Sequence, residues 1–213
     1  MSARATEGQR TYVPAAGYDW LLPLYDVLAK VIGSEAAHRQ LVNQADIKPT
    51  HRVLDIGCGT GSLTLLIKRL HPRAEVVGLD PDPKALARAR RKAEERGLAV
   101  RLDRGFSDEL PYADASFDRV FSAFMLHHLA LDEKQKTLRE ARRVLRNGGV
   151  FHALDFGGTG HDNGIIAYLF HRAHLEDQHR IPALMREAHF AEVTELAPRA
   201  TILGRVSYWR AFG

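Results

Sequence analysis

The feature that most constrains the fold is a glycine-rich turn between an apolar run and a helical pattern. Residues 53–61 read Val-Leu-Asp-Ile-Gly-Cys-Gly-Thr-Gly. Val53, Leu54 and Ile56 form the continuous apolar run that a parallel strand buried on both faces requires. Leucine and isoleucine then recur at helical spacing over residues 62–70. Glycines at such a junction allow backbone conformations and a close ligand approach that side chains would block. The sequence therefore predicts a strand, a ligand-binding turn and a helix.

The spacing of the glycines indicates the kind of ligand. Gly57, Gly59 and Gly61 stand at every second position, whereas the dinucleotide fingerprint G-x-G-x-x-G needs its third glycine where Ser62 stands. The pattern is D-x-G-x-G-x-G, which begins at Asp55. A carboxylate ahead of the turn would repel a pyrophosphate, but it suits a ligand that carries an ammonium group. A nicotinamide dehydrogenase is therefore disfavoured.

A second acidic residue ends the next apolar run, residues 74–80. Asp80 follows Gly61 by roughly the 20 positions at which nucleoside-binding βαβ units place a ribose carboxylate. One carboxylate can accept hydrogen bonds from both ribose hydroxyls. Asp82 precedes the helix predicted over residues 84–95 and is the better candidate for its N-cap. We therefore assign Asp80 to a ribose and Asp82 mainly to structure.

A third block of motifs covers residues 110–129. Pro and Asp-x-Ser turn residues precede a buried strand predicted over 120–124. Open α/β sheets bind ligands beyond the carboxyl ends of their strands. Ser122, Ala123 and Met125 are therefore expected to face the reacting group.

The rest of the chain predicts further elements. We expect a helix that runs through Arg146, stops at an Asn-Gly-Gly turn over 147–149, and is followed by a buried strand over 150–154. A short helix is predicted over 181–190. The tail, 201–210, alternates like a closing strand that pairs antiparallel at the edge of the sheet.

With these motifs in order across residues 50–156, the chain resembles the class I S-adenosylmethionine-dependent methyltransferases. The resemblance implies an α/β fold, a Rossmann-like three-layer α/β/α sandwich with a seven-stranded, mostly parallel sheet and an antiparallel C-terminal strand. It also implies S-adenosyl-L-methionine as the methyl donor and S-adenosyl-L-homocysteine as the product. An aromatic segment, residues 12–26, is similar to the entry segment of the ubiquinone/menaquinone-biosynthesis branch. We expect an N-terminal helical lid or substrate segment over 1–46 and a core over 47–213, within one domain.

The resemblance implies a set of cofactor-binding residues. Asp55 and the glycine turn would hold the methionine end, Asp80 the ribose, and 105–107 would border the adenine. The family's usual Gly-Asp pair is here Gly105-Phe106, so stacking by Phe106 and a contact from Asp108 both remain open. The expected residues are Tyr25, Asp55, Gly57, Cys58, Gly59, Gly61, Asp80, Pro81, Gly105, Phe106, Ser107, Ser122, Ala123 and Met125.

No residue of the sequence shows itself as an indispensable catalyst, which is compatible with a donor whose leaving group is already charged. His128 and His161 lie where a general base could reach a substrate hydroxyl, although the His127-His128 pair also suits capping or packing. His171, His174 and His179 lack the acid-rich or cysteine spacing of a metal site, so no metal is expected.

Composition and charge bear on the partners. The net charge is +4, but the basic stretch over 84–104 lacks interleaved aromatic residues, so nucleic acid is an unlikely partner. A small-molecule acceptor of the methyl group, at oxygen, nitrogen or carbon, is favoured over the alternatives of an RNA methyltransferase and a non-catalytic cofactor-binding protein. The single cysteine, Cys58, suits a reducing cytoplasm. No signal peptide or membrane span is expected, and the protein is expected to be a monomer or homodimer.

Overall fold

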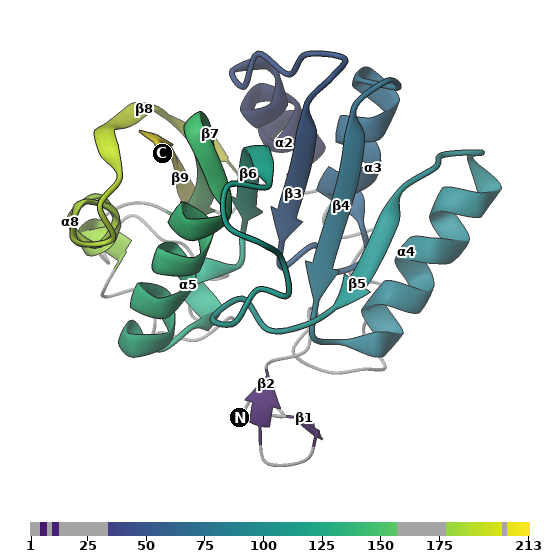
Figure 1. Cartoon of the computed structure of the whole chain (residues 1–213), viewed down its shortest axis with the longest axis horizontal. Helices are drawn as coiled ribbons and strands as arrows, with labels where there is room; N and C mark the ends of the chain where they lie inside the picture. Colours follow the sequence, from purple (N-terminus) through teal and green to yellow (C-terminus); the bar gives the residue numbers. More distant parts are fainter. Residues whose placement is uncertain (1–4, 8–9, 13–33, 157–177, 202–203) are drawn as a thin grey trace.

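The computed structural model describes residues 5–7, 10–12, 34–156, 178–201 and 204–213 (Figure 1). The strands of its main sheet are β3 (Arg52–Ile56), β4 (Glu75–Asp80), β5 (Arg101–Arg104), β6 (Phe117–Ala123), β7 (Leu145–Phe156), β8 (Ala191–Thr201) and β9 (Gly204–Phe212). The helices are α2 (Ser34–Asn43), α3 (Ser62–Leu70), α4 (Pro83–Glu95), α5 (Leu131–Val144) and α8 (Ile181–Glu187), with short 3₁₀ turns η2 (Leu126–His128) and η3 (Gln178–Arg180). A separate antiparallel hairpin joins β1 (Ala5–Glu7) and β2 (Arg10–Tyr12).

The seven strands lie in the order β5-β4-β3-β6-β7-β9-β8. The first five are parallel neighbours, and β9 runs antiparallel to both β7 and β8. From β3 the chain moves outward through β4 to β5, and then starts again on the other side of β3 with β6. The sheet therefore has its topological switch point between β3 and β6, where open α/β sheets bind ligands at the carboxyl edge. The expected Rossmann-like architecture is confirmed.

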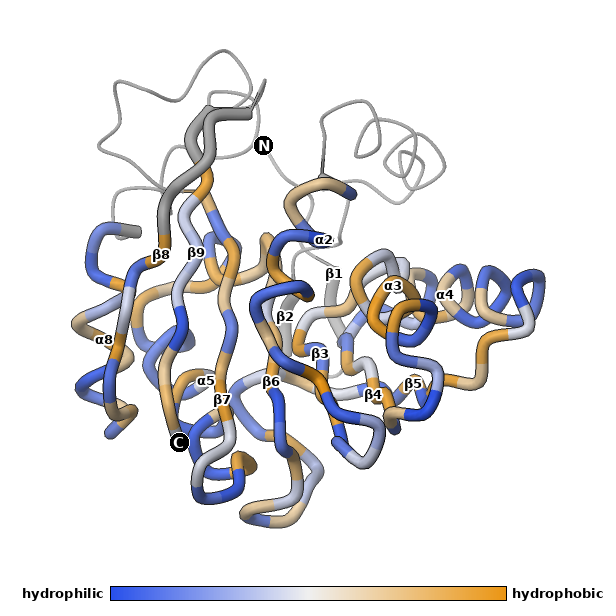
Figure 2. The backbone as a smooth tube through the Cα atoms, turned by 90° about the horizontal axis from the view of Figure 1, so that it is seen from above, coloured by the Kyte–Doolittle hydropathy of each residue, from blue (hydrophilic) through white to orange (hydrophobic). Residues whose placement is uncertain are grey.

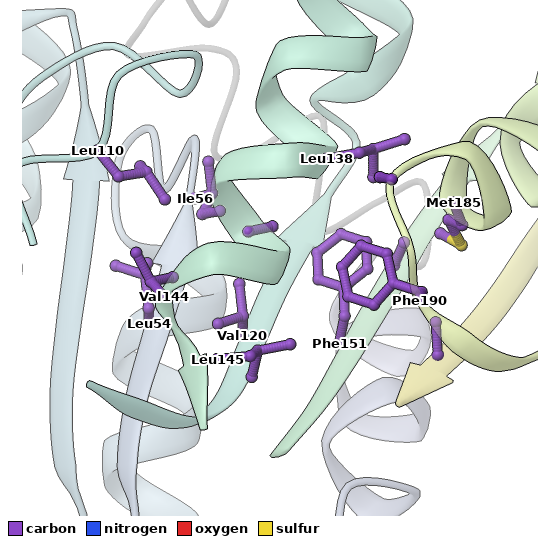
Figure 3. Packing of buried hydrophobic residues seen from close by; sticks show 14 of the residues in the cluster. Leu54, Ile56, Leu110, Val120, Leu138, Val144, Leu145, Phe151, Met185 and Phe190 are labelled. Carbon is purple, nitrogen blue, oxygen red and sulfur yellow. The ribbon is translucent and has the colours of Figure 1, made fainter. Parts of the chain in front are cut away.

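Two buried apolar layers cover the faces of the sheet. One lies between the sheet and the helices α5 and α8, with Leu138, Met185 and Phe151 in contact through one cluster (Figure 3). Phe151 and Phe190 stack there with ring centroids 5.4 Å apart. The other joins α2 and α3 to the opposite face. Figure 2 shows the strands following one another from β8 to β5 across the view from above. Each fully buried large apolar side chain stabilises the fold by about 1.5–3 kcal/mol, so the two layers contribute much of the stability of the sheet.

The junction between α5 and β7 differs from the sequence prediction. The helix ends at Val144, because Leu145 adopts extended backbone angles and pairs with Phe117 in β6. Arg146 consequently lies in β7, where its guanidinium contacts Asp118 at 2.9 Å. Gly148, with φ 75°, forms an irregularity within the strand rather than a stop to the helix. The buried strand expected over 150–154 is confirmed as the middle of β7.

The C-terminal elements also differ in part. The tail does pair antiparallel, as predicted, but β9 lies inside the sheet between β7 and β8, and β8 forms the edge. The short helix α8 ends at Glu187 instead of continuing to residue 190, because His189 takes up a left-handed backbone conformation with φ 64°.

Within the described ranges, none of the helices combines the length and the apolar character needed to span a membrane. Helix α2 packs into the same buried cluster as α3 and β9. The division into a segment over 1–46 and a core over 47–213 stays a prediction.

Candidate functional site

The glycine turn follows β3 at the carboxyl edge of the sheet, as predicted. Gly57, Gly59 and Gly61 have φ values of 72°, 52° and 79°, the left-handed region that favours glycine. The backbone N–H groups of Gly57 and Cys58 both donate to the carbonyl of Leu79, at 2.8 and 3.0 Å. The turn is therefore fixed against the end of β4, and helix α3 begins directly after it.

Glycine is also required at two of these positions by close neighbours. A Cβ added at Gly57 would overlap the Met125 side chain, which follows β6. A Cβ added at Gly61 would lie 2.9 Å from the Cβ of Ala89 in α4. Because Met125 lies against the turn, the segments that follow β3 and β6 meet at the switch point, as the sequence placed them.

Asp80 ends β4 and holds the glycine turn through hydrogen bonds. Its Oδ2 accepts a hydrogen bond from the Gly59 N–H at 2.8 Å, and its Oδ1 accepts one from the Asp82 N–H at 2.9 Å. Each carboxylate oxygen has further lone pairs, so Asp80 keeps the capacity to accept from two hydroxyls. Burial raises the pKa of Asp80 to about 6, against the opposing effect of the two backbone donors. The side chain is 7% exposed.

Asp82 has the structural role that the sequence predicted. Its side chain accepts a hydrogen bond from the Lys84 N–H at 2.8 Å and caps the N-terminus of α4, with Pro83 at the first helical position. Cys58 also has a packing role, since its Sγ lies where a Cβ on Gly78 of β4 would approach to 2.9 Å. Burial raises the pKa of the Cys58 thiol well above its usual value.

Asp55 is buried at the junction of β3 and α3. The Thr64 hydroxyl donates to its Oδ2 at 2.6 Å, and burial raises the pKa of the carboxyl to about 7. The carboxyl thus ties the start of α3 to the strand that precedes the turn. Its expected contact with the methionine end of a cofactor stays a prediction.

The segment expected at the adenine follows β5. The Gly105 N–H donates to the carbonyl of Asp80 at 3.3 Å, which brings this segment beside the ribose candidate. The Ser107 hydroxyl shares a 2.8 Å hydrogen bond with the Thr137 hydroxyl of α5, so α5 holds it in place. Pro81 accepts through its carbonyl from Arg104 at 3.2 Å. Phe106 and Asp108 are both half-buried, and both alternatives for the adenine contact remain predictions.

The end of β6 combines an unpaired hydroxyl with a strained residue. The buried Oγ of Ser122 has no hydrogen-bond partner within the described ranges. Phe124 has φ 53°, an uncommon conformation for a residue other than glycine, and its N–H donates to the carbonyl of Leu154 in β7 at 2.8 Å. Such strain clusters at ligand sites, where the surrounding structure holds it in place. Ala123 and Met125, the other expected residues, lie on either side of Phe124 and are half-buried.

Sequence reasoning missed the most extensively bonded side chain at this edge. Asp155, at the end of β7, is fully buried and lies 2.7 Å from His127 Nδ1 through Oδ1. It also accepts the backbone N–H groups of His127, at 3.0 Å, and Phe156, at 2.8 Å. The ring of His128, the base candidate from the sequence, lies 3.9 Å from that of His127 between centroids. The signal in the sequence was an acidic residue at the carboxyl end of a buried strand.

Several predicted residues lie outside the described ranges, namely Tyr25, His161, His171 and His174. The part of the chain that the structure describes holds no group of three side chains able to bind a metal ion.

The residues present fit a nucleoside with an amino-acid tail. The Asp80 carboxylate retains acceptor capacity beside the glycine turn, and Ser122 has a hydroxyl without a partner among the described residues. The first turn of α3 also offers backbone N–H groups beyond the glycine turn.

Comparisons with known proteins agree with this geometry. The methyltransferase domain family matches residues 53–149. A demethylmenaquinone methyltransferase of Thermus thermophilus is 42% identical over 139 residues, which cover 64% of this chain and 62% of the relative. A demethylmenaquinone methyltransferase of Deinococcus radiodurans is 34% identical over 167 residues, which cover 77% of this chain and 66% of the relative. The chain therefore spans slightly less than two thirds of the length of these relatives.

A solved structure extends the likeness to three dimensions. The YcgJ protein of Bacillus subtilis superposes with a TM-score of 0.67 at 26% identity, covering 77% of this chain and 71% of that protein. The fold, the order of the motifs and the matched domain all indicate a methyltransferase. The chain therefore carries a methyltransferase domain over residues 53–149 and is similar in sequence and fold to S-adenosylmethionine-dependent methyltransferases.

Proposed function

We propose that this protein transfers a methyl group from S-adenosylmethionine to a nucleophilic atom of a small molecule. The observation that carries the proposal is the Asp80 carboxylate, which holds the Gly59 N–H of the turn and retains acceptor capacity for a ribose. The match of residues 53–149 to the methyltransferase domain supports it. S-adenosylmethionine supplies an electrophilic methyl group on a sulfonium when it is bound.

The residues of the chain would bind and orient the two reactants. Asp80 would accept the ribose hydroxyls, the turn over 57–61 and Asp55 would receive the methionine end, and residues 105–107 would border the adenine. The segment over 122–125 would lie beside the sulfonium. Their contribution to the rate is alignment of the reacting atoms and exclusion of water.

We further propose a quinol as the acceptor, with a ring carbon as the atom that is methylated. The support is the identity of this chain to two relatives named demethylmenaquinone methyltransferase, at 42% and 34%. The aromatic side chains of Phe124 and Phe156, 5.2 Å apart between ring centroids at the same edge of the sheet, suit an aromatic acceptor. The cytoplasmic location, the monomeric or homodimeric state and S-adenosylhomocysteine as product stay predictions.

Calorimetric titration with S-adenosylmethionine and S-adenosylhomocysteine tests the cofactor. Wild-type protein is expected to bind both, and Asp80→Ala to bind them about 100-fold more weakly, since hydrogen bonds to a charged group contribute about 1.5–3 kcal/mol each. Asp80→Asn is the second variant, because it keeps an acceptor for the turn. Asp132→Ala, which removes an exposed carboxylate on α5, is the matched control. A folded wild-type protein that binds neither ligand would contradict the proposal.

Turnover with a labelled methyl donor separates the remaining alternatives. The proposed function predicts label in 1,4-naphthohydroquinone, kept reduced by dithionite. Label in RNA instead would favour an RNA methyltransferase. Cofactor binding with no transfer to any acceptor would favour a non-catalytic binding protein.

A further inference from the structure

His127 and Asp155 form a buried pair to which the proposed function assigns no role. Asp155 Oδ1 lies 2.7 Å from His127 Nδ1 and also accepts the Phe156 N–H at 2.8 Å. Asp155 Oδ2 accepts the His127 backbone N–H at 3.0 Å. The backbone and the ring of His127 are thus both fixed by one carboxylate, which sets the direction of the imidazole.

This arrangement also fixes which ring nitrogen carries the proton. Both oxygens of Asp155 already accept backbone N–H groups, so the carboxylate is an acceptor and Nδ1 is the donor. In a neutral imidazole the other nitrogen, Nε2, then has a free lone pair. Nε2 takes no part in the contact of the ring with Asp155. The titratable group beside it is His128, with ring centroids 3.9 Å apart.

The pair lies at the edge of the sheet where the methyl acceptor must come. Asp155 ends β7, the neighbour of β6, and His127 follows Met125, whose side chain lies against the glycine turn at Gly57. Phe156 contacts the His127 ring edge-on, with centroids 5.0 Å apart. The imidazole therefore packs against the Phe156 ring, two positions along the chain from the side chain that contacts the glycine turn.

We propose, on the basis of the proposed function, that His127 is the general base of the reaction and that Asp155 is its positioning residue. His127 Nε2 takes the proton from a phenolic hydroxyl of the acceptor, so the O–H bond breaks and an N–H bond forms. The negative charge left on oxygen is shared with the ring carbon beside it. That carbon forms the new bond to methyl, while the carbon–sulfur bond breaks and its electron pair stays on sulfur.

The remaining proton transfers restore the aromatic ring. The methylated carbon loses its hydrogen as a proton to solvent, and the oxygen regains a proton from His127. The net products are the methylated quinol, S-adenosylhomocysteine and one proton. Asp155 stabilises the imidazolium while His127 holds the proton. Positioned general bases contribute rate factors of roughly 10²–10⁴.

The variant His127→Asn tests the base without removing the contact to Asp155. The asparagine amide can still donate to the carboxylate from about the place of Nδ1, but it has no basic nitrogen. We expect turnover of 1,4-naphthohydroquinone to fall by about 10²–10⁴-fold, with binding of S-adenosylhomocysteine within threefold of wild type. Asp155→Asn is expected to lower turnover in the same direction, because its amide can donate to Nδ1 and so favour the wrong tautomer. His179→Asn, on the exposed turn η3, is the control.

Two further readouts separate a base from a merely structural role. At a pH high enough to ionise the hydroxyl without a base, the defect of His127→Asn should shrink toward wild type. With S-adenosylhomocysteine bound, no methyl group can be transferred. When 1,4-naphthohydroquinone is added at neutral pH, wild-type protein should then show the absorbance of its ionised form, and His127→Asn should not.

The outcomes distinguish this inference from the proposed function. Wild-type protein that methylates the quinol, with His127→Asn equally active, overturns the inference alone, as does a defect that high pH does not reduce. A loss confined to His128→Asn would assign the base to that residue instead and also overturns it. Wild-type protein that binds S-adenosylhomocysteine but neither ionises nor methylates the quinol overturns the proposed acceptor and the inference together.

Discussion

Replacing Gly61 with alanine should destabilise the protein through a contact that has no room to relax. Gly61 has φ 79°, and its added Cβ would lie 2.9 Å from the Cβ and 3.4 Å from the Cα of Ala89 in α4. Ala89 has no flexible side chain that could move aside, so α4 or the turn must shift. Gly97→Ala is the matched control, because Gly97 has φ 61° and nothing within 4 Å of an added Cβ.

Gly61→Ala and Gly97→Ala share the cost of a left-handed backbone conformation, but only Gly61→Ala adds the cost of overpacking. The left-handed conformation costs an L-residue about 1–2 kcal/mol, offset by about 0.4–1 kcal/mol from the stiffer unfolded chain. Gly97→Ala should therefore lower the free energy of unfolding by about 1 kcal/mol or less. Overpacking adds about 1–3 kcal/mol, so Gly61→Ala should lower it by about 2–4 kcal/mol.

Urea denaturation followed by circular dichroism measures both free energies of unfolding. The double variant Gly61→Ala with Ala89→Gly removes the contact between the two Cβ atoms. After allowance for the cost of about 1 kcal/mol that glycine carries within a helix, it should recover part of the stability that Gly61→Ala loses. Equal losses for Gly61→Ala and Gly97→Ala, or no recovery in the double variant, would refute the packing argument at the glycine turn.

Three other substitutions give distinct signatures. Burial lowers the pKa of His152 to about 3, so as the pH falls below 6.5 the unfolded state binds a proton that the folded state does not, and the protein loses stability. Between pH 7.5 and pH 5, the free energy of unfolding of His152→Leu should therefore rise by about 2 kcal/mol relative to that of wild type, as measured by urea denaturation. No such gain would contradict a buried neutral ring. Asp82→Ala removes the cap on the Lys84 N–H and should cost about 1 kcal/mol in the same assay, whereas an unchanged midpoint would show that the cap is dispensable. Burial raises the pKa of Asp80 to about 6, so calorimetric affinity for S-adenosylhomocysteine should fall as the pH drops below 6 and should lose much of this dependence in Asp80→Asn; a parallel pH dependence in both proteins would argue against ionised Asp80 as the ribose ligand.

The glycine turn was predictable because each of its determinants is visible in a short motif. The glycine spacing over 57–61 and the cap of α4 at Asp82 depend on neighbouring residues, and Asp80 follows the turn at the separation typical of a βαβ unit. The end of α5 was not, since it depends on the pairing of Leu145 with Phe117 in another strand. The position of β9 in the sheet was not predictable either, because an alternating pattern predicts a strand but not the strands with which it pairs.

The pairing of His127 with Asp155 illustrates the limit for the site. The two residues lie 28 positions apart, and their contact follows from the register of β6 against β7 rather than from any local pattern. The sequence pattern made His128 a candidate base and gave no sign that the ring of the neighbouring His127 would be the one bonded to an acid. Burial of the acid at the end of a parallel strand was the missing clue.

The position of β9 has a consequence for the order in which the sheet can be completed. During synthesis, residues 191–201 leave the ribosome before 204–212, yet among the strands that the structure describes β8 pairs only with β9, and β7 pairs on that side only with β9. Until β9 is available, the growing chain presents the bare backbone of β7 as an open edge. Unpaired edges of this kind recruit other strands. Assembly of this half of the sheet therefore waits for β9, and the open edge of β7 exposes the chain to misassociation until β9 pairs with it.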